Sequence, residues 1–303
     1  MWKYAIKRIL LAAVTIFIII AITFFAMNAI PGGPFNKEKA TDPAVLAVLE
    51  ARYNLDKPVP VQFLLYLKNL LHGDLGISLK TGRDISTIIG ESFPISARLG
   101  GMAILVALVL GLFFGSIAAL NRNKWPDRAI IFFTTFFVSV PSFVLATLLL
   151  LVFCLKLGWV PVWSTTRTNY VLPVIALAMY PMSYITRLTK SSMLDVLGQD
   201  YIRTARAKGV HTGKVIFKHA LRNALIPVVT YVGPMSAYIL TGSLVVETVF
   251  TIGGLGSKFV TGISYRDYPL IMGTTIFLAT IMVIMTLLSD LAYKAVDPNI
   301  KFE

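Results

Sequence analysis

Charged residues are scarce in this sequence, at only 14% of 303 residues, whereas soluble domains carry roughly a quarter. Together with an apolar fraction of 56%, this scarcity excludes an ordinary soluble globular protein. Cysteine is nearly absent as well. The single Cys154 excludes a disulfide within the chain and a cysteine-based metal site, and its place in an apolar run favours a packed small side chain.

The residues that catalysis or metal binding require are also missing. His72, His211 and His219 do not have the spacing of a metal site. Segment 209–215 has three residues between its glycines instead of the four of a phosphate-binding loop, and Val215 stands where that loop has the Ser or Thr that holds Mg²⁺. We therefore predict that the chain is not an enzyme and binds no cofactor or metal itself.

Long apolar runs dominate the sequence instead. Five charge-free runs reach the ~20 residues that cross a bilayer. They are residues 9–30, 99–120, 129–155, 225–246 and 270–289. A sixth run, 171–186, is shorter and contains Pro173 and Pro181, which membrane helices tolerate. The sequence predicts an all-α, polytopic membrane protein with about six transmembrane helices.

These predicted spans have no ionisable side chain near their middle, and Glu247 and Asp290 lie near span ends. Gradient-driven carriers usually place such a group within the bilayer. We therefore expect the energy for any transport to come from outside the chain. A secondary carrier or channel is the first alternative, and a membrane-embedded enzyme, which would need catalytic residues, is the second.

Charge also predicts how the chain is oriented. With the N-terminus inside, the inner segments carry 16 Lys/Arg and 6 Asp/Glu, and the outer segments carry 12 and 9. The excess of basic residues on the inside predicts that both termini are cytoplasmic. Inner-leaflet lipid explains the net charge of +13, so nucleic acid is not an expected partner.

The predicted organisation has four parts. Residues 1–30 comprise the N-terminal cytoplasmic residues and the first span, 31–96 an external region, 97–296 a five-helix core, and 297–303 a cytoplasmic tail.

The external region is predicted to contain three short helices. One starts at Pro43, one covers 61–72 with Gly73 as its stop, and one covers 84–92 before Pro94. This region is either a loop that packs on the membrane face or a docking platform or lid, and the sequence leaves both open.

Residues 187–224 form a long basic loop inside, after the fourth span. The loop has no proline, and its only glycines are Gly198, Gly209 and Gly213. We predict helices over 191–208 and 214–224 with a bend at 209–213. Two helices attached at both ends to spans would act as a rigid lever, and a helical hairpin on lipid head groups is the alternative.

Three further features concern the membrane part. The G-x-x-x-G at 111–115 indicates close helix packing, more within this chain than between chains. The fifth span is the most polar, so it is the predicted translocation path. Its candidate residues are Gly233, Ser236, Tyr238, Thr241 and Ser243. Gly253, Gly254 and Gly256 form either an external gate or a flexible turn.

Several motifs in order suggest a family. They include LDKP at 55–58 with Gln62, GDLGIS at 73–78, PSF at 141–143, KLGWVP at 156–161, RLTKSSML at 187–194, GQDY at 198–201, RTARAKG at 203–209, HALRNA at 219–224, ETVF at 247–250, GLG at 254–256 and RDYP at 266–269. Over nearly its whole length the sequence resembles the B-type permease subunits of the oligopeptide/dipeptide (and nickel) ABC importers. The wider ABC-importer pattern is Glu-Ala-Ala, three residues and Gly. Here Arg203 replaces the acid, so it is not given the acid's role.

The resemblance implies a type I ABC importer permease that forms half of a pore for oligopeptides or dipeptides in a bacterial or archaeal cell membrane. The implied partners are a second homologous permease, two ATPase subunits that bind ATP and Mg²⁺, and an external solute-binding protein. Loop 198–224 would insert into a cleft of the ATPase. The expected coupling residues are Asp200, Tyr201, Arg203, Thr204, Ala205, Arg206, Lys208, Gly209, His219 and Arg222.

Overall fold

A computed structural model describes residues 2–30 and 54–296. In these residues every regular element is a helix, and β pairing is limited to an isolated bridge between Ile77 and Asp84. The predicted helix starting at Pro43 lies outside the described residues. The chain forms two compact units, Met1–Ile95 with Gly253–Val283, and Ser96–Ile252 with Ile284–Glu303.

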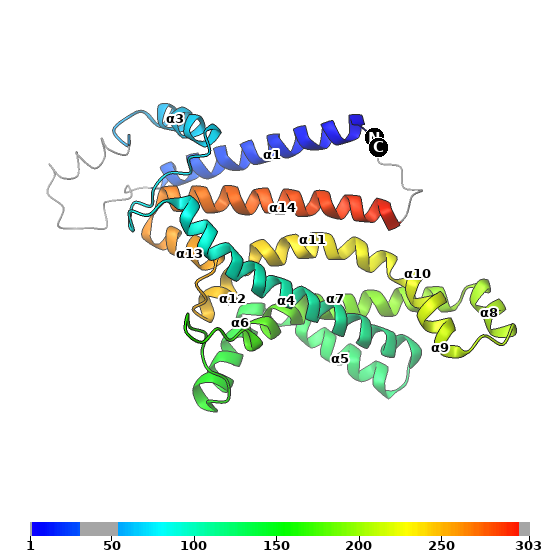
Figure 1. Cartoon of the computed structure of the whole chain (residues 1–303). Coiled ribbons are helices and arrows are strands. Elements are labelled where there is room, and N and C mark those ends of the chain that lie inside the picture. The colour runs from blue at the N-terminus through cyan, green and yellow to red at the C-terminus, as the bar shows by residue number, and fades with distance from the viewer. Residues whose placement is uncertain (1, 31–53, 297–303) are drawn as a thin grey trace. The chain divides into compact units, whose positions relative to one another are not determined.

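The first unit is built on the first and last long helices. It contains α1 (Trp2–Ala29), α3 (Val59–Leu71), the start of α4 (Ile85–Leu120), α13 (Leu255–Tyr265) and the first part of α14 (Tyr268–Val296) (Figure 1). Its main core consists of Ile20, Phe24 and Met27 of α1 with Ile271, Met272 and Ile276 of α14. Several partly buried side chains of α3 pack against this core. The predicted helix over 61–72 is thus confirmed, and it ends before Gly73, which has a φ of +79°.

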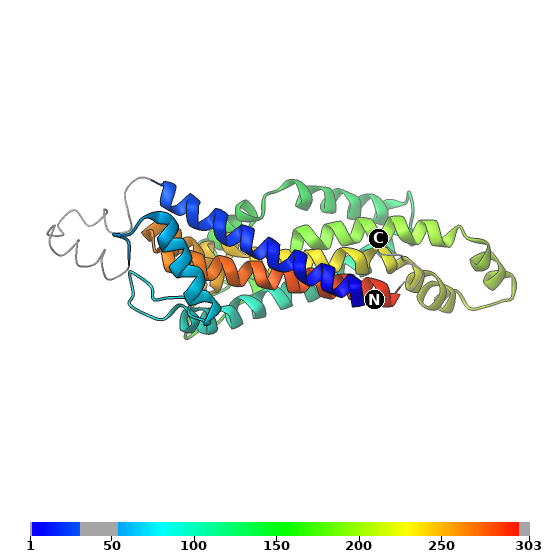
Figure 2. The ribbon, with the colours of Figure 1, turned by 90° about the horizontal axis from the view of Figure 1, so that it is seen from above.

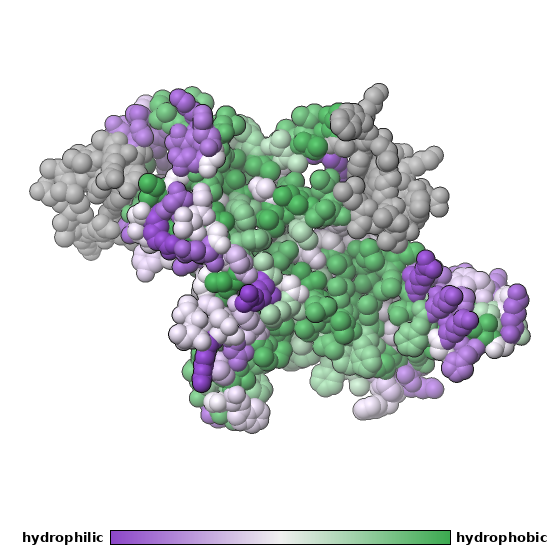
Figure 3. All heavy atoms as spheres, in the orientation of Figure 1, coloured by the Kyte–Doolittle hydropathy of each residue, from purple (hydrophilic) through white to green (hydrophobic). Residues whose placement is uncertain are grey.

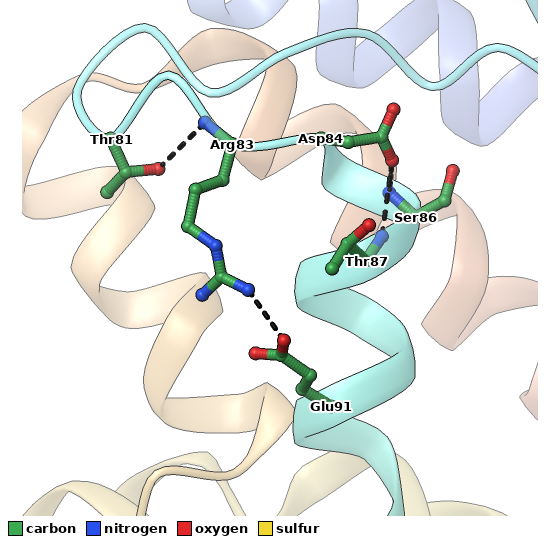
Figure 4. Close-up of polar contacts among 6 residues, drawn as sticks. All are labelled: Thr81, Arg83, Asp84, Ser86, Thr87 and Glu91. Carbon is green, nitrogen blue, oxygen red and sulfur yellow. Dashed lines mark hydrogen bonds and ion pairs between the residues drawn. The ribbon is translucent and has the colours of Figure 1, made fainter.

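Asp84 starts α4 as its N-cap. Its carboxylate accepts hydrogen bonds from the backbone N–H groups of Ser86 at 2.7 Å and Thr87 at 3.2 Å (Figure 4). Beside it, Arg83 forms a 2.6 Å ion pair with Glu91, about two turns further along α4 (Figure 4).

The prediction that this helix ends before Pro94 is wrong, because α4 continues through Pro94 to Leu120. A proline inside a helix costs one hydrogen bond, which surrounding packing in a membrane protein offsets. Such packing lies directly beside it, where Phe93 meets Phe277 edge to face at 4.9 Å.

The second unit contains the rest of α4 and most of the remaining helices (Figures 1 and 2). They are α5 (Trp125–Ser139), α6 (Ser142–Leu149), η1 (Leu150–Lys156, a π-helix), α7 (Val171–Leu197), α8 (Asp200–Ala207), α9 (Thr212–Lys214), η2 (Val215–Leu221, also π), α10 (Arg222–Ala224), α11 (Ile226–Gly242) and α12 (Leu244–Val249). Among the described residues, five helices are long and apolar enough to cross a membrane, and a bent pair makes up to six. The predicted all-α class with about six spans is confirmed.

The bent pair corrects the third predicted span. Residues 129–155 were expected to form one helix, but α5 and the α6–η1 segment meet at an angle of 100°. Pro141 is the cause. It disfavours a helical conformation at Val140, which is extended with φ −86° and ψ 121°.

The glycines of the 111–115 motif bring α4 against α7. A Cβ at Gly111 would lie 2.7 Å from Ile185 Cγ2, and a Cβ at Gly115 would lie 2.7 Å from the backbone oxygen of Thr186. Only glycine permits backbones this close. The predicted packing within the chain is therefore confirmed.

A nearly buried ion pair joins α5 to α7. Asp127 in the first turn of α5 is 4% exposed and lies 2.5 Å from Lys190 Nζ. The other carboxylate oxygen of Asp127 accepts a hydrogen bond from the N–H of Asn123. Because a buried charge is costly without a partner, this pair fixes the position of the turn before α5 on α7.

Candidate functional site

The segment 198–224, which we call the elbow, connects α7 to α11 through α8, α9, η2 and α10. In both ribbon views α8 and α9 lie beyond the ends of α4 and α5 at that side of the second unit (Figures 1 and 2). The predicted single helix over 191–208 is wrong, because α7 continues from the membrane to Leu197 and α8 begins only at Asp200. The break is Gly198 followed by Gln199, which is extended with φ −73° and ψ 151°.

The elbow has an apolar core of its own. Ile202, Val215 and Ala220 are at most 1% exposed and pack together with Val196, Leu197, Ala205 and Val210. In α8, Ile202 is the one buried residue and Ala205 packs beside it, while most of the other side chains of the helix are exposed. This core gives the elbow a defined shape.

Gly209 ends α8 in a left-handed conformation with a φ of +73°. Its N–H donates to the carbonyl of Arg206 at 3.0 Å, and the N–H of Val210 donates to that of Ala205 at 3.1 Å. These two bonds define a Schellman motif, and Val210 and Ala205 both pack against the elbow core. The predicted bend at 209–213 is confirmed, and α9 starts just after it, with His211 as its N-cap.

Most of the predicted coupling residues share one property, which is exposure. Those at the surface are Asp200, Tyr201, Arg203, Thr204, Arg206, Lys208, Gly209 and Arg222, whereas Ala205 and His219 are partly buried. The elbow carries six exposed Lys or Arg side chains and one acid, Asp200. Hydrophilic residues gather at this end of the face in Figure 3. Such a surface favours a partner with acidic groups.

The exposed side chains of the elbow make few polar contacts with the rest of the second unit. Tyr201 Oη accepts a hydrogen bond from Asn223 Nδ2 at 2.8 Å, which joins α8 to α10. Arg203 and Asp200 form a 3.5 Å ion pair that is exposed and therefore weak. A further exposed residue of the elbow, absent from the predicted set, is Phe217, which is 72% exposed on η2 beside Lys218. An aromatic residue within a basic helical loop is the signal that would have found it.

The five predicted path residues do not share one surface. Ser236 and Ser243 are buried, and Gly233 packs so closely on Ser289 that a Cβ there would lie 1.8 Å from the serine hydroxyl. Tyr238 is 63% exposed, and Thr241 belongs to α11 with a side chain outside the described residues. Neighbouring residues of a helix point to different sides, so these residues differ in what they contact.

Tyr238 lines a cavity of about 720 Å³ in the second unit, between the bend at Pro141, α7 and α11. Three prolines line it, namely Pro141, Pro181 and Pro234, together with Tyr180 and Tyr231. Pro181 and Pro234 lie inside helices, where the missing N–H leaves a backbone carbonyl without its helical partner. No prediction from the sequence included this cavity, although each of three apolar runs contains a proline that could have indicated it.

Glu247 is fully buried beside this region, at the break between α11 and α12. Its carboxylate accepts hydrogen bonds from the hydroxyls of Ser96 on α4 and Ser243. Both hydrogen bonds offset part of the cost of burying a polar side chain. Among the described residues, no group of three His, Cys, Asp or Glu could hold a metal ion.

The three candidate gate glycines lie at the start of α13. Gly254 is its extended N-cap, Gly256 is buried in its first turn, and Gly253 is partly buried. The left-handed residue in this segment is Thr251, with a φ of +55°.

Two family models match the chain. Residues 111–302 match "Binding-protein-dependent transport system inner membrane component", and residues 1–100 match the corresponding N-terminal model. The chain is 49% identical to the dipeptide transport system permease protein DppB of Bacillus subtilis, covering 99% of this chain and 98% of that one. It is 42% identical to the oligopeptide transport system permease protein OppB of Haemophilus influenzae, with full coverage of both.

Solved structures share the fold. The MetNI methionine ABC transporter matches with a TM-score of 0.56 at 18% identity, over 70% of this chain and 97% of that one. An amino acid ABC transporter matches with a TM-score of 0.52 at 16% identity, over 71% and 95%. The chain therefore belongs to the binding-protein-dependent transport system inner membrane components, a family of multi-pass permeases of the cell membrane.

Proposed function

We propose that this permease forms half of the pore of an ABC-type importer for dipeptides or oligopeptides. The permeases DppB and OppB, whose names state dipeptide and oligopeptide transport, support this substrate class. A second homologous permease completes the pore, and an external solute-binding protein delivers the peptide. Two ATPase subunits bind ATP and Mg²⁺, and both termini of this chain lie on their side of the membrane.

The elbow carries this proposal. It has its own apolar core, a fixed bend at Gly209 and an exposed basic surface, so a push on α8 reaches α7 and α11 without being absorbed in a flexible loop. ATP-driven closure of the ATPase pair moves the elbow as a rigid body, and the spans alternate between inward-open and outward-open states.

Reconstitution tests the energy source. The complete transporter in proteoliposomes, with binding protein and a labelled dipeptide or tripeptide, is expected to accumulate peptide only when ATP is supplied on the elbow side. This chain alone, given a proton or sodium gradient, is expected to accumulate none. Gradient-driven uptake by the chain alone would refute the proposed function.

Charge reversal tests the docking surface. The double variant Arg206→Glu and Lys208→Glu is expected to lower the yield of ATPase subunits that co-purify with the permease, because it places two acids on an exposed basic surface. Lys156→Glu, an equally exposed basic residue at the end of η1, is the matched control and should leave the yield unchanged. An unchanged yield for the double variant would argue against docking through α8.

A further inference from the structure

We propose that α3 is a membrane-embedded helix, and that its outward face contacts lipid acyl chains in the leaflet around the C-terminal end of α1. This places part of the region between the first two spans within the bilayer rather than on it or in water.

The depth of α3 follows from its contacts with α1. The candidate span of α1 has 22 residues, about 33 Å of helix, against a hydrocarbon thickness of ~30 Å, so both its ends lie near the membrane surfaces. The ring of Phe63 lies 6.3 Å from that of Phe17 and 5.1 Å from that of Phe25. Phe25 is about 6 Å and Phe17 about 18 Å along the helix from Ala29. Phe63 therefore lies inside the apolar length of α1.

The ring of Phe24 fixes α3 at the same depth. It lies 5.2 Å from Phe63 and 6.1 Å from Tyr66, so two successive turns of α3 contact the last turns of α1. Figures 1 and 2 show α3 against the end of α1 that leads to Ala29. A helix in this position has at least its α1-facing side below the lipid head groups.

The exposed residues of α3 are mostly apolar, with Lys68 and Asn69 as the exposed polar residues. Val61 is 41%, Leu64 64% and Leu71 87% exposed, whereas the opposite face packs on the core of the first unit. A water-facing helix would carry polar residues at these positions. Lys68 lies on the same face, and its long side chain can reach the head groups while its stem stays in the apolar layer.

Continuity with α1 identifies lipid as the occupant. Ile18, Ile22 and Phe25 of α1 are 47%, 64% and 44% exposed, and Phe25 contacts Phe63, the neighbour of Leu64. The exposed apolar surfaces of the two helices thus meet at one contact. Since α1 crosses the membrane, the solvent that covers its exposed side chains at this depth also covers Leu64.

Spin labels on the whole transporter test the proposal. In a Cys154→Ser background, Leu64→Cys is labelled with a nitroxide, and the complex is placed in vesicles of phosphatidylethanolamine and phosphatidylglycerol. Collisions with oxygen, which partitions into acyl chains, and with a water-soluble nickel chelate are then measured. Ile22→Cys is the lipid control. Thr81→Cys is the water control, because it precedes a 36-residue α4 that is far longer than a bilayer needs.

The ratio of oxygen to nickel-chelate collisions at the Leu64 label is expected to equal the ratio at Ile22. Collisions with the nickel chelate should be frequent at Thr81 and rare at Leu64. Val61→Cys repeats the measurement in case one variant does not assemble. A ratio like that at Thr81 would overturn the proposal in favour of water. Protection from both reagents would overturn it in favour of a protein partner on this face. Neither outcome would bear on ATP-driven uptake, which the reconstitution measures separately.

Discussion

Gly209→Pro is expected to abolish peptide uptake while the permease still inserts and the ATPase subunits still hydrolyse ATP. Proline fixes φ near −65°, whereas Gly209 requires +73°, and it removes the N–H that bonds to Arg206. An incompatible proline costs about 3 kcal/mol or more, enough to break the Schellman motif. Because the break would separate α8 from α9, movement of one would no longer carry the other. Uptake and ATPase activity measured on the same proteoliposomes would show this uncoupling.

Gly209→Asn is the matched control for this prediction. Asparagine adopts the left-handed conformation more readily than other side chains and keeps the N–H, so the motif and most of the uptake should remain. Nothing lies within 4 Å of a Cβ added at Gly209, so a side chain there is not excluded by space. Normal coupled uptake by Gly209→Pro would refute the rigid elbow.

Gly115→Leu is expected to destabilise the permease strongly. A Cβ at Gly115 already meets Thr189 Cβ at 2.6 Å and the Thr186 carbonyl at 2.7 Å, and backbone cannot move aside as a flexible side chain can. Helices α4 and α7 would have to separate. We expect a loss of at least the ~1–3 kcal/mol that overpacking typically costs. The thermal unfolding midpoint of the detergent-purified chain and the recovered monodisperse fraction should both fall.

Gly101→Leu provides the comparison, since it lies on the same helix and a Cβ there meets nothing within 4 Å. This variant should unfold at or above the wild-type temperature, because leucine is the better helix former. Equal behaviour of the two variants would mean that close contact between α4 and α7 does not limit stability.

Local sequence signals predicted the number of spans, the helix over 61–72 and the bend at 209. Long apolar runs predicted the spans, and Gly209 predicted the bend. Both features depend on residues that are near one another in the chain. Proline was harder to interpret. Pro94 lies inside α4 without ending it, whereas Pro141 bends the third span by 100°. Tertiary packing distinguishes the two cases, and no local pattern carries that information.

The candidate sites likewise include residues that local sequence could predict and residues that it could not. Exposed charges in the elbow could be predicted, because a basic helical loop has few other places to put them. The path residues could not, because polarity along α11 does not tell which side faces a neighbour. Ser236 is buried and Tyr238 exposed, although they are only two residues apart. The cavity wall combines Pro141 from the bend between α5 and α6, Tyr180 from α7 and Tyr231 from α11, which only the fold brings together.

The ion pair between Asp127 and Lys190 also constrains the order of biosynthesis. Asp127 leaves the ribosome 63 residues before its partner, a delay of roughly 3–13 s at about 5–20 residues per second. Throughout that interval the carboxylate lacks the partner that accompanies its burial in the folded protein, so we expect the start of α5 to stay hydrated. The turn at 121–124 can settle on α7 only after the fourth span has been translated.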